Sequence, residues 1–380
     1  MARDFDPSRR QWLRAGVLGA AGAALLGAPA ARSWPGAAAA GADAAAPLRL
    51  NLNESSFGPS PRAVQAIQRA LAEVPRYVTA DQAQALRAQI GRIEGVAPEQ
   101  VLVGEVLEAL GQHLAIGGGG GEFVYSVPGY GALVDAAAPF GGRAVEVPLD
   151  ARLHNDLPGL AAAVGPRTRA LFVVNPHNPS GTLSEGGAFD AFLREVSRRT
   201  LAIVDEAYLD YRDDAARLTA ARLLREGANV VVFRTFGKIH GLAGLQIGYA
   251  IAPLPLAREL AARGVGSAHG LNQLSVAAAV ASLEDTAHVA AVRQAVAAER
   301  RQWLALLGRL RLRHAEPAGN FVFFDGGRPH AELAAKLLER GVRVARAFPP
   351  YATWLRITIG RPEENAVARR ALVEVLAPAG

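Results

Sequence analysis

Seven short apolar runs separated by helical stretches constrain the fold of this 380-residue chain more than any other feature. They read VLVG, EFVYSVPGY, AVEVPL, ALFVVNP, LAIVDEAY, VVVFRTF and IGYAIAP, and they lie between residues 101 and 253. Runs that are apolar at nearly every position suit strands buried on both faces. Their alternation with helices therefore predicts an α/β domain of three layers, with helices around a mostly parallel sheet.

The chain beyond this region has a different pattern. A long helical region spans roughly 272–310, and the runs NFVFFD, VRVARAF and WLRITIG follow it with helices between them. This order predicts a second, smaller α+β domain. Upstream, the segment SPRAVQAIQRALAEV places four apolar residues on one helical stripe, namely Val64, Ile67, Leu71 and Val74. We expect an N-terminal arm and helix at 48–75, a large domain at 76–285 and a small domain at 286–380.

The N-terminus predicts a targeting segment. Arg9 and Arg10 precede an uncharged stretch at 15–28, and APA at 28–30 is a candidate signal-peptidase site. This pattern is typical of a twin-arginine export signal at 1–30, followed by a disordered Ala/Gly-rich linker at 31–47. We therefore expect an exported, periplasmic protein with no stable membrane span. A short membrane anchor or an uncleaved apolar tail is the alternative, although the stretch is short for a bilayer.

Composition excludes several classes of function. The chain has no cysteine, which rules out disulfides, thiolate catalysis and cysteine-based zinc sites. Its eight histidines show no HxH or HExxH spacing, so no metal site is expected. The net charge of +6 is partly in the leader, and no Lys/Arg run is interleaved with aromatic residues. Nucleic-acid binding is therefore not expected.

The chain has only two lysines among its 41 basic residues, Lys238 and Lys336. Arginine stays protonated in proteins, whereas a neutral lysine amine attacks carbonyls and forms Schiff bases. Lys336 lies in the helical pattern AELAAKLLERG and reads as a surface residue. Lys238 follows a buried run and precedes GLAG, where backbone can approach a ligand closely. A surface loop lysine is the plain alternative, but the position predicts that Lys238 is a nucleophile.

The ends of the neighbouring apolar runs carry what a Schiff-base cofactor such as pyridoxal 5'-phosphate needs. Asp205 can hold the proton of the ring nitrogen, Tyr208 and Asn178 can donate to the phenolic oxygen, and Tyr130 can cover the ring. Each residue alone has an ordinary interpretation as a cap, a turn former or part of the core. Ligands in open α/β sheets bind at strand ends, so the four together predict a cofactor site.

The order of the motifs NLNESSFGPSP, VPGY, NPHNPSGTL, DEAY, TFGKIHGLAGLQIGY and LRITIG resembles the fold-type I pyridoxal-phosphate aminotransferases. It is most similar to their histidinol-phosphate aminotransferase branch, from about residue 48 to the C-terminus. The resemblance implies a homodimer in which Lys238 binds the cofactor and then moves the substrate's proton. It further implies cofactor contacts from Thr235, Gly104, Glu105 and Val106, a contact from Tyr77 to the neighbouring subunit's cofactor phosphate, and substrate contacts from Arg356, Asn53 and Arg346.

Three residues depart from the family pattern around the cofactor phosphate. Gly237 and Gln246 stand where the family usually has Ser and Arg, and Glu105 would repel a phosphate unless it points away. Arg234 is close enough in sequence to compensate. We expect an aminotransferase that moves an amino group between an amino acid, or an amino-alcohol phosphate, and a 2-oxo acid. The alternatives are another pyridoxal-phosphate reaction such as racemisation, elimination or decarboxylation, or a non-catalytic binding protein with a degenerate phosphate site.

Overall fold

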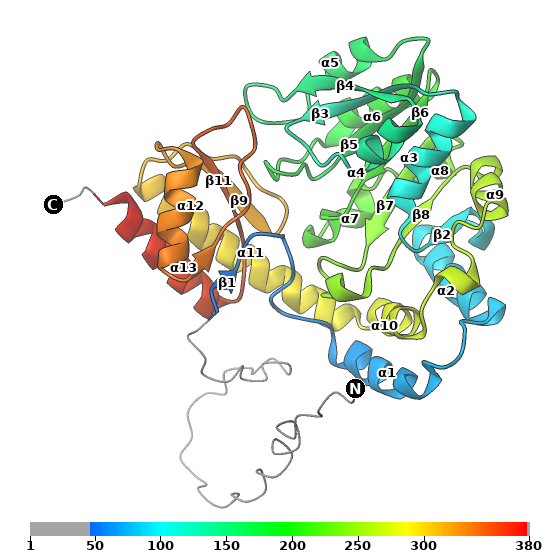
Figure 1. The fold of residues 1–380 in the computed structure, drawn as a ribbon, viewed down its shortest axis with the longest axis horizontal. Helices are drawn as coiled ribbons and strands as arrows, with labels where there is room; N and C mark the ends of the chain where they lie inside the picture. Colours follow the sequence, from blue (N-terminus) through cyan, green and yellow to red (C-terminus); the bar gives the residue numbers. More distant parts are fainter. Residues whose placement is uncertain (1–45, 378–380) are drawn as a thin grey trace, which may run out of the picture. The chain divides into compact units, whose positions relative to one another are not determined.

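The computed structural model describes residues 46–377, and the seven predicted runs form one seven-stranded sheet in the order β2-β8-β7-β6-β5-β3-β4 (Figure 1). The strands are β2 (Val101–Val103), β3 (Gly121–Val127), β4 (Gly142–Pro148), β5 (Thr168–Val174), β6 (Leu201–Asp205), β7 (Val230–Thr235) and β8 (Gly248–Ile251). Only β8 runs antiparallel to its two neighbours, β2 and β7. The predicted mostly parallel α/β sheet is confirmed.

Alternate residues of each strand enter separate hydrophobic clusters on the two faces of the sheet. Val230 and Val232 belong to one cluster, whereas Val231 belongs to the other. The first cluster includes side chains of α2 (Ala80–Glu94), α5 (Leu157–Ala163), α6 (Gly186–Ser197), α8 (Ala221–Arg225) and α10 (Gln273–Glu284). The second includes side chains of α3 (Val106–Gly117), α4 (Ala132–Ala137) and α9 (Leu254–Ala262). The strands are therefore buried on both faces, which explains their nearly continuous apolar sequence.

Short helical turns join several of these elements. They are η3 (Pro98–Gln100), η4 (Ala138–Phe140), η5 (Leu209–Tyr211), α7 (Ala215–Leu218), η6 (Ala243–Leu245) and η7 (Ala268–Gly270). The turn η5 begins four residues after Asp205, the last residue of β6, and Tyr208 lies directly before it. This segment supplies residues to the candidate site.

The C-terminal region is a smaller unit of mixed structure, as the sequence predicts. Strands β9 (Phe321–Asp325) and β11 (Trp354–Thr358) pair antiparallel, and α11 (Thr286–Arg309), α12 (His330–Glu339) and α13 (Pro362–Leu376) lie beside them (Figure 1). The helical region predicted at 272–310 is two helices, because Asp285 caps α11 by accepting a hydrogen bond from the His288 backbone at 3.3 Å.

The segment before the first helix also joins the C-terminal region. Strand β1 (Leu48–Arg49) pairs in parallel with β10 (Val342–Arg343). The Thr358 backbone N–H donates to the Leu50 carbonyl oxygen at 2.9 Å. Residues 51–53, which line the cavity described below, are thereby held against β11.

The helix α1 (Pro61–Ala70), with the turn η2 (Leu71–Glu73), forms where the sequence predicts a helix, but the expected apolar stripe is not its buried face. The buried side chains are Ala63, Ala66 and Ala70, which lie on the side packed against α10. Leu71 and Val74 are 57% and 58% exposed. The periodicity identified the helix correctly, but it could not show which side the rest of the chain covers.

The predicted export signal at 1–30 and most of the linker at 31–47 lie outside the described residues. Within residues 46–377, no helix combines the length and the apolar character needed to cross a membrane.

Candidate functional site

A cavity of about 430 Å³ lies at the carboxyl ends of the parallel strands and gathers most of the predicted site residues. Asn178 follows β5, Asp205 ends β6 and Thr235 ends β7, and these strands are neighbours in the sheet. The predicted residues that line the cavity are Lys238, Asp205, Tyr208, Asn178, Tyr130, Thr235, Glu105, Asn53, Arg346 and Arg356. A larger hollow of about 640 Å³ contains none of them.

Lys238 lies in the loop between β7 and β8. Its Nζ donates to the Leu52 carbonyl oxygen at 3.3 Å and lies 5.7 Å from the centre of the Tyr208 ring. The side chain is only partly buried, so the amine is accessible from the cavity. An amine in this position can reach a carbonyl group bound over the strand ends.

Asp205 is 2% exposed at the end of β6, and its Oδ1 accepts a hydrogen bond from the Ala207 backbone at 2.9 Å. Burial raises the pKa of its carboxyl group to about 6, against the opposing effects of the Ala207 N–H and of Lys238. A buried carboxylate with few partners is suited to pair with a protonated ring nitrogen of a ligand.

Tyr208 connects the two amide side chains of the site. Its hydroxyl oxygen accepts from Asn53 Nδ2 at 3.1 Å and from Asn178 Nδ2 at 3.5 Å. Since both contacts use the oxygen as acceptor, the hydroxyl hydrogen remains available to a ligand oxygen. Asn53 is 1% exposed and adopts a positive φ of 55°, and Thr358 Oγ1 donates to its Oδ1 at 3.2 Å. Asn53 thus lines the cavity and also holds the Tyr208 hydroxyl in position through its hydrogen bond.

Arg356, in β11, is a buried cation whose described hydrogen-bond partners are all neutral. Its Nη1 donates to Asn178 Oδ1 at 2.5 Å and its Nη2 donates to the Asn51 carbonyl oxygen at 2.7 Å, and the residue is 6% exposed. Burial lowers the pKa of the guanidinium to about 10. Within residues 46–377, the hydrogen bonds of Arg356 go to an amide oxygen and a backbone carbonyl oxygen, and its Nε has no partner. An anionic ligand in the cavity would therefore give this buried cation its counter-charge.

Arg346 brings a second cation to the same part of the cavity. Its guanidinium lies 4.6 Å from the centre of the Phe348 ring, and that of Arg356 lies 5.1 Å from the same ring. Arg346 is exposed, and its Nη1 donates to the Ala347 carbonyl oxygen at 2.9 Å. Two guanidinium groups therefore share one aromatic ring at the side of the cavity formed by the C-terminal region.

The start of α3 places two carboxylates on the cavity wall. Glu105 and Glu108 both line the cavity, and Glu105 also lines the adjoining hollow. Burial, with a smaller contribution from Glu108, raises the pKa of Glu105. Glu108 was not predicted from the sequence, although a spacing of three residues from Glu105 places both on one side of a helix. Asn51 and Phe348 were not predicted either, because they reach the cavity only through tertiary contacts.

Three predicted site residues, Gly104, Val106 and Tyr77, do not line the cavity. Gly104 and Val106 line an adjoining hollow that shares Glu105 with the cavity, and the Val106 side chain is 1% exposed in the core. Gln246 lines the same adjoining hollow. Tyr77 is 77% exposed, and its ring meets the His269 ring edge-on at 5.2 Å.

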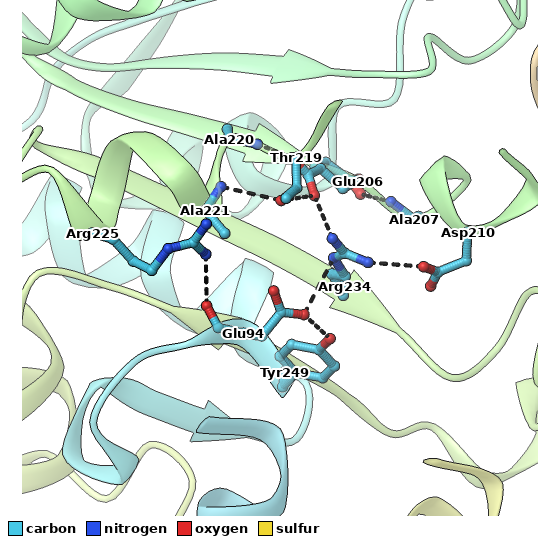
Figure 2. A network of polar contacts seen from close by, with 11 residues as sticks. Glu94, Glu206, Ala207, Asp210, Thr219, Ala220, Ala221, Arg225, Arg234 and Tyr249 are labelled. Atoms are coloured by element: carbon cyan, nitrogen blue, oxygen red, sulfur yellow. Dashed lines mark hydrogen bonds and ion pairs between the residues drawn. The ribbon is translucent and has the colours of Figure 1, made fainter. Parts of the chain in front are cut away.

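Arg234 does not compensate for the altered phosphate residues, because its guanidinium faces the opposite side of β7. Figure 2 shows it among three carboxylates, at 3.0 Å from Glu206, 2.8 Å from Asp210 and 3.7 Å from Glu94. Arg234 is 8% exposed and does not line the cavity. Strand alternation explains this result, since Phe233 and Thr235 line the cavity and the residue between them must point away.

The fold and the cavity define a class of enzyme in which a lysine at the strand ends of an α/β sheet binds a carbonyl group beside a buried carboxylate. Comparison with known proteins specifies the class further. The model of the family "Aminotransferase class I and II" matches residues 46–372, and the chain belongs to this family. The expected aminotransferase, an enzyme dependent on pyridoxal 5'-phosphate, is thereby confirmed.

Individual relatives carry the name of one branch of the family. The chain is 37% identical over 338 residues to the histidinol-phosphate aminotransferase of Moorella thermoacetica, covering 87% of this chain and 86% of the relative. It is 38% identical to that of Anaeromyxobacter, covering 86% and 90%. The histidinol-phosphate aminotransferase of Sinorhizobium meliloti, solved in complex with pyridoxal 5'-phosphate, superposes with a TM-score of 0.78 at 30% identity over 87% of this chain and 91% of that chain.

Proposed function

We propose that this chain is an exported, homodimeric aminotransferase whose amino donor carries an anionic group that pairs with Arg356. The observation that carries the proposal is the position of this buried cation. It lines the same cavity as Lys238, and its described partners are neutral. A carboxylate or phosphate oxygen of the donor would complete the ion pair and present the donor's amino group toward the lysine.

The side chains present fit the ring of pyridoxal 5'-phosphate. When bound, the cofactor supplies an aldehyde carbon and an electron-withdrawing ring. Asp205 is positioned to hold the proton of the ring nitrogen, and Tyr208 and Asn178 are positioned to donate to the phenolic oxygen. Tyr130, on the wall of the cavity, can cover the ring. Lys238 Nζ is the base that removes and returns the proton on the donor's α-carbon.

The two arginines beside Phe348 indicate which anionic groups the amino donor carries. Arg356 accounts for one anionic group, and Arg346 can meet a second group nearer the mouth of the cavity. An amino acid with an acidic side chain or an amino-alcohol phosphate satisfies this arrangement. The relatives' name, histidinol-phosphate aminotransferase, is consistent with an anionic donor. A 2-oxo acid would return to the same Arg356 in the second half of the reaction.

Exposed apolar residues near Tyr77 support a dimer. Leu71, Val74 and Tyr77 are 57%, 58% and 77% exposed within seven residues of chain. A second copy covering this surface would bury them, and it would bring Tyr77 near another protein surface. Export rests on the paired arginines at 9 and 10 and the apolar stretch that follows them.

Two other functions fit parts of the site. Another pyridoxal-phosphate reaction, such as racemisation, elimination or decarboxylation, would use the same lysine and carboxylate. A non-catalytic binding protein is favoured by the carboxylates of Glu105 and Glu108, which line the cavity next to the residues for which the resemblance implies a phosphate contact. Transfer of the amino group to a 2-oxo acid in a single turnover would separate the aminotransferase from the other pyridoxal-phosphate reactions. Only the aminotransferase keeps the nitrogen for the second substrate.

The test of the proposed function compares the only two lysines. The purified protein is mixed with pyridoxal 5'-phosphate, and we expect an absorbance band at roughly 410–430 nm, as for a lysine imine. Borohydride should then fix the cofactor covalently. Lys238→Ala should abolish both the band and the fixation, whereas Lys336→Ala should keep both, since Lys336 Nζ pairs with Glu332 on α12 at 2.9 Å. A band that survives Lys238→Ala would reject the assignment of this lysine.

A further inference from the structure

The chemical structure of the cofactor fixes which end of the cavity its phosphate would meet. In pyridoxal 5'-phosphate the aldehyde carbon lies between the phenolic oxygen and the phosphate arm, so these two groups leave opposite sides of the ring. Asn178, proposed for the phenolic oxygen, follows β5, and Asp205 ends β6. Thr235 ends β7, and Glu105 follows β2, which lies beyond β8 on that side of the sheet. If the proposed function holds, the phosphate arm points toward Thr235 and Glu105.

This end of the cavity is acidic. Glu105 and Glu108, at the start of α3, line the cavity, whereas its three cations are Lys238, Arg346 and Arg356. Both arginines lie against the ring of Phe348, on the side of the cavity formed by the C-terminal region. Lys238 is committed to the aldehyde. Thr235 Oγ1 accepts a hydrogen bond from the Gly237 backbone at 3.0 Å, which leaves its own hydroxyl hydrogen as a neutral donor.

Two cations from β7 and from the adjoining hollow are held elsewhere. Arg234 pairs with Glu206 and Asp210 on the opposite side of β7. Arg263 lines the adjoining hollow behind Glu105, and its Nη2 pairs with Glu259 at 3.4 Å. Gln246 is exposed in that hollow and carries no charge. Within residues 46–377, no arginine or lysine therefore faces the expected position of the phosphate.

We infer that the site does not select for the phosphate of its cofactor and binds pyridoxal, the unphosphorylated aldehyde, within about tenfold of the affinity for pyridoxal 5'-phosphate. The ring contacts and the bond to Lys238 are the same for both aldehydes. A single charge-assisted hydrogen bond contributes about tenfold to a hundredfold in affinity, so a site with several such bonds would separate the two aldehydes by about a thousandfold or more. Here the described residues supply no arginine or lysine for such bonds, and Glu105 opposes the phosphate.

The experiment titrates the purified full chain with each aldehyde and follows the lysine-dependent absorbance band, which is a binding readout independent of turnover. We expect the two dissociation constants to agree within about tenfold at pH 8. A preference for pyridoxal 5'-phosphate of more than tenfold would overturn the inference. Absence of a band with both aldehydes, or a band that persists in Lys238→Ala, would instead overturn the proposed function on which the inference rests.

Two variants test the structural cause. Glu105→Gln removes the charge at this end, and it should tighten binding of pyridoxal 5'-phosphate about threefold to tenfold while leaving pyridoxal binding unchanged. Glu99→Gln is the matched control, because Glu99 is an exposed carboxylate on η3 outside the cavity, and it should change neither constant. Arg263→Ala should also change neither. An equal response of both aldehydes to Glu105→Gln, or a weakened phosphate complex in Arg263→Ala, would contradict this account.

Discussion

The segment from Asp205 to Asp210 has two sides that differ in how completely their polar groups are paired. Asp205, Ala207 and Tyr208 line the cavity, whereas Glu206 and Asp210 face Arg234 beneath the sheet. Glu206 accepts from Arg234 at 3.0 Å, from the Thr219 hydroxyl at 2.8 Å and from the Ala220 backbone at 2.7 Å. On the cavity side, the described hydrogen bond to the Asp205 carboxylate comes from the Ala207 backbone alone.

Within these six residues, the side facing Arg234 stabilises the fold and the side facing the cavity is suited to bind a ligand. The Arg234 side joins α2, β6, β7 and β8 through Glu94, Glu206 and Tyr249, whose hydroxyl donates to Glu94 at 2.6 Å (Figure 2). It holds the segment in place. On the cavity side, the Asp205 carboxylate is buried and the Arg356 guanidinium has no counter-charge among the described residues. Both features lower the stability of the ligand-free protein. Removing a charged group should therefore lower the free energy of unfolding on the Arg234 side and raise it on the cavity side.

The largest effect is expected for Arg234→Met. This change leaves Glu206 and Glu94, which are 2% and 5% exposed, buried without their cation, and it should lower the free energy of unfolding by about 3–5 kcal/mol. Urea unfolding of the cofactor-free protein at pH 8 measures the loss. Arg194→Met is the control, because Arg194 pairs with Glu226 where both side chains are about half exposed, and its cost should be about 0–1 kcal/mol. Equal costs for the two variants would show that the buried cluster is not held by charge.

A smaller effect of opposite sign is expected for Asp205→Asn. The pKa of Asp205 is raised from 3.8 to about 6 in the folded protein, so the folded state binds its proton more tightly than the unfolded state does. The stability linked to this proton is present below pH 3.8 and is lost as the pH rises through about 6. Asparagine removes the buried charge, and it should raise the free energy of unfolding of the cofactor-free protein at pH 8 by about 1–3 kcal/mol.

The pH dependence provides the control for this variant. At pH 4 the gain from Asp205→Asn should nearly vanish, because the native carboxyl group is then largely protonated and uncharged. The same variant should lose the lysine-dependent absorbance band or the transamination that follows it, since the ring nitrogen has no carboxylate partner. A variant that is less stable than the native protein at pH 8 would show that Asp205 is a structural residue and not a poised functional one.

The sequence predicted the sheet and much of the site for one physical reason. Strands buried on both faces have continuous apolar runs, and a polar residue directly after such a run must lie at the edge of the sheet. This logic placed Asp205, Asn178 and Thr235 together. It did not place Arg234 correctly, although strand alternation from Thr235 carries the necessary signal.

Other features depend on partners that are distant in the sequence. The burial of α1 through Ala63, Ala66 and Ala70 follows from its contact with α10, some two hundred residues further on. The direction of Glu105 depends on how α3 begins, and a sequence period does not give that orientation. Arg356 could be assigned to an anion from the family resemblance, but its neutral partners, the Asn51 carbonyl and the Asn178 amide, are visible only in the fold.

The smallest expected effect comes from a matched pair of hydroxyl deletions on the two sides of the segment. Thr219→Val removes the donor to Glu206 and the acceptor of the Ala221 backbone N–H, both buried, so we expect a loss of about 1–2 kcal/mol in the free energy of unfolding. Tyr208→Phe removes the acceptor of the Asn53 and Asn178 amides, which line the cavity, where water can take its place. Its cost should be about 0.5 kcal/mol or less. Urea unfolding without cofactor measures both. A Tyr208→Phe loss as large as that of Thr219→Val would mean that the cavity side also stabilises the fold, and the separation of the two sides would then fail.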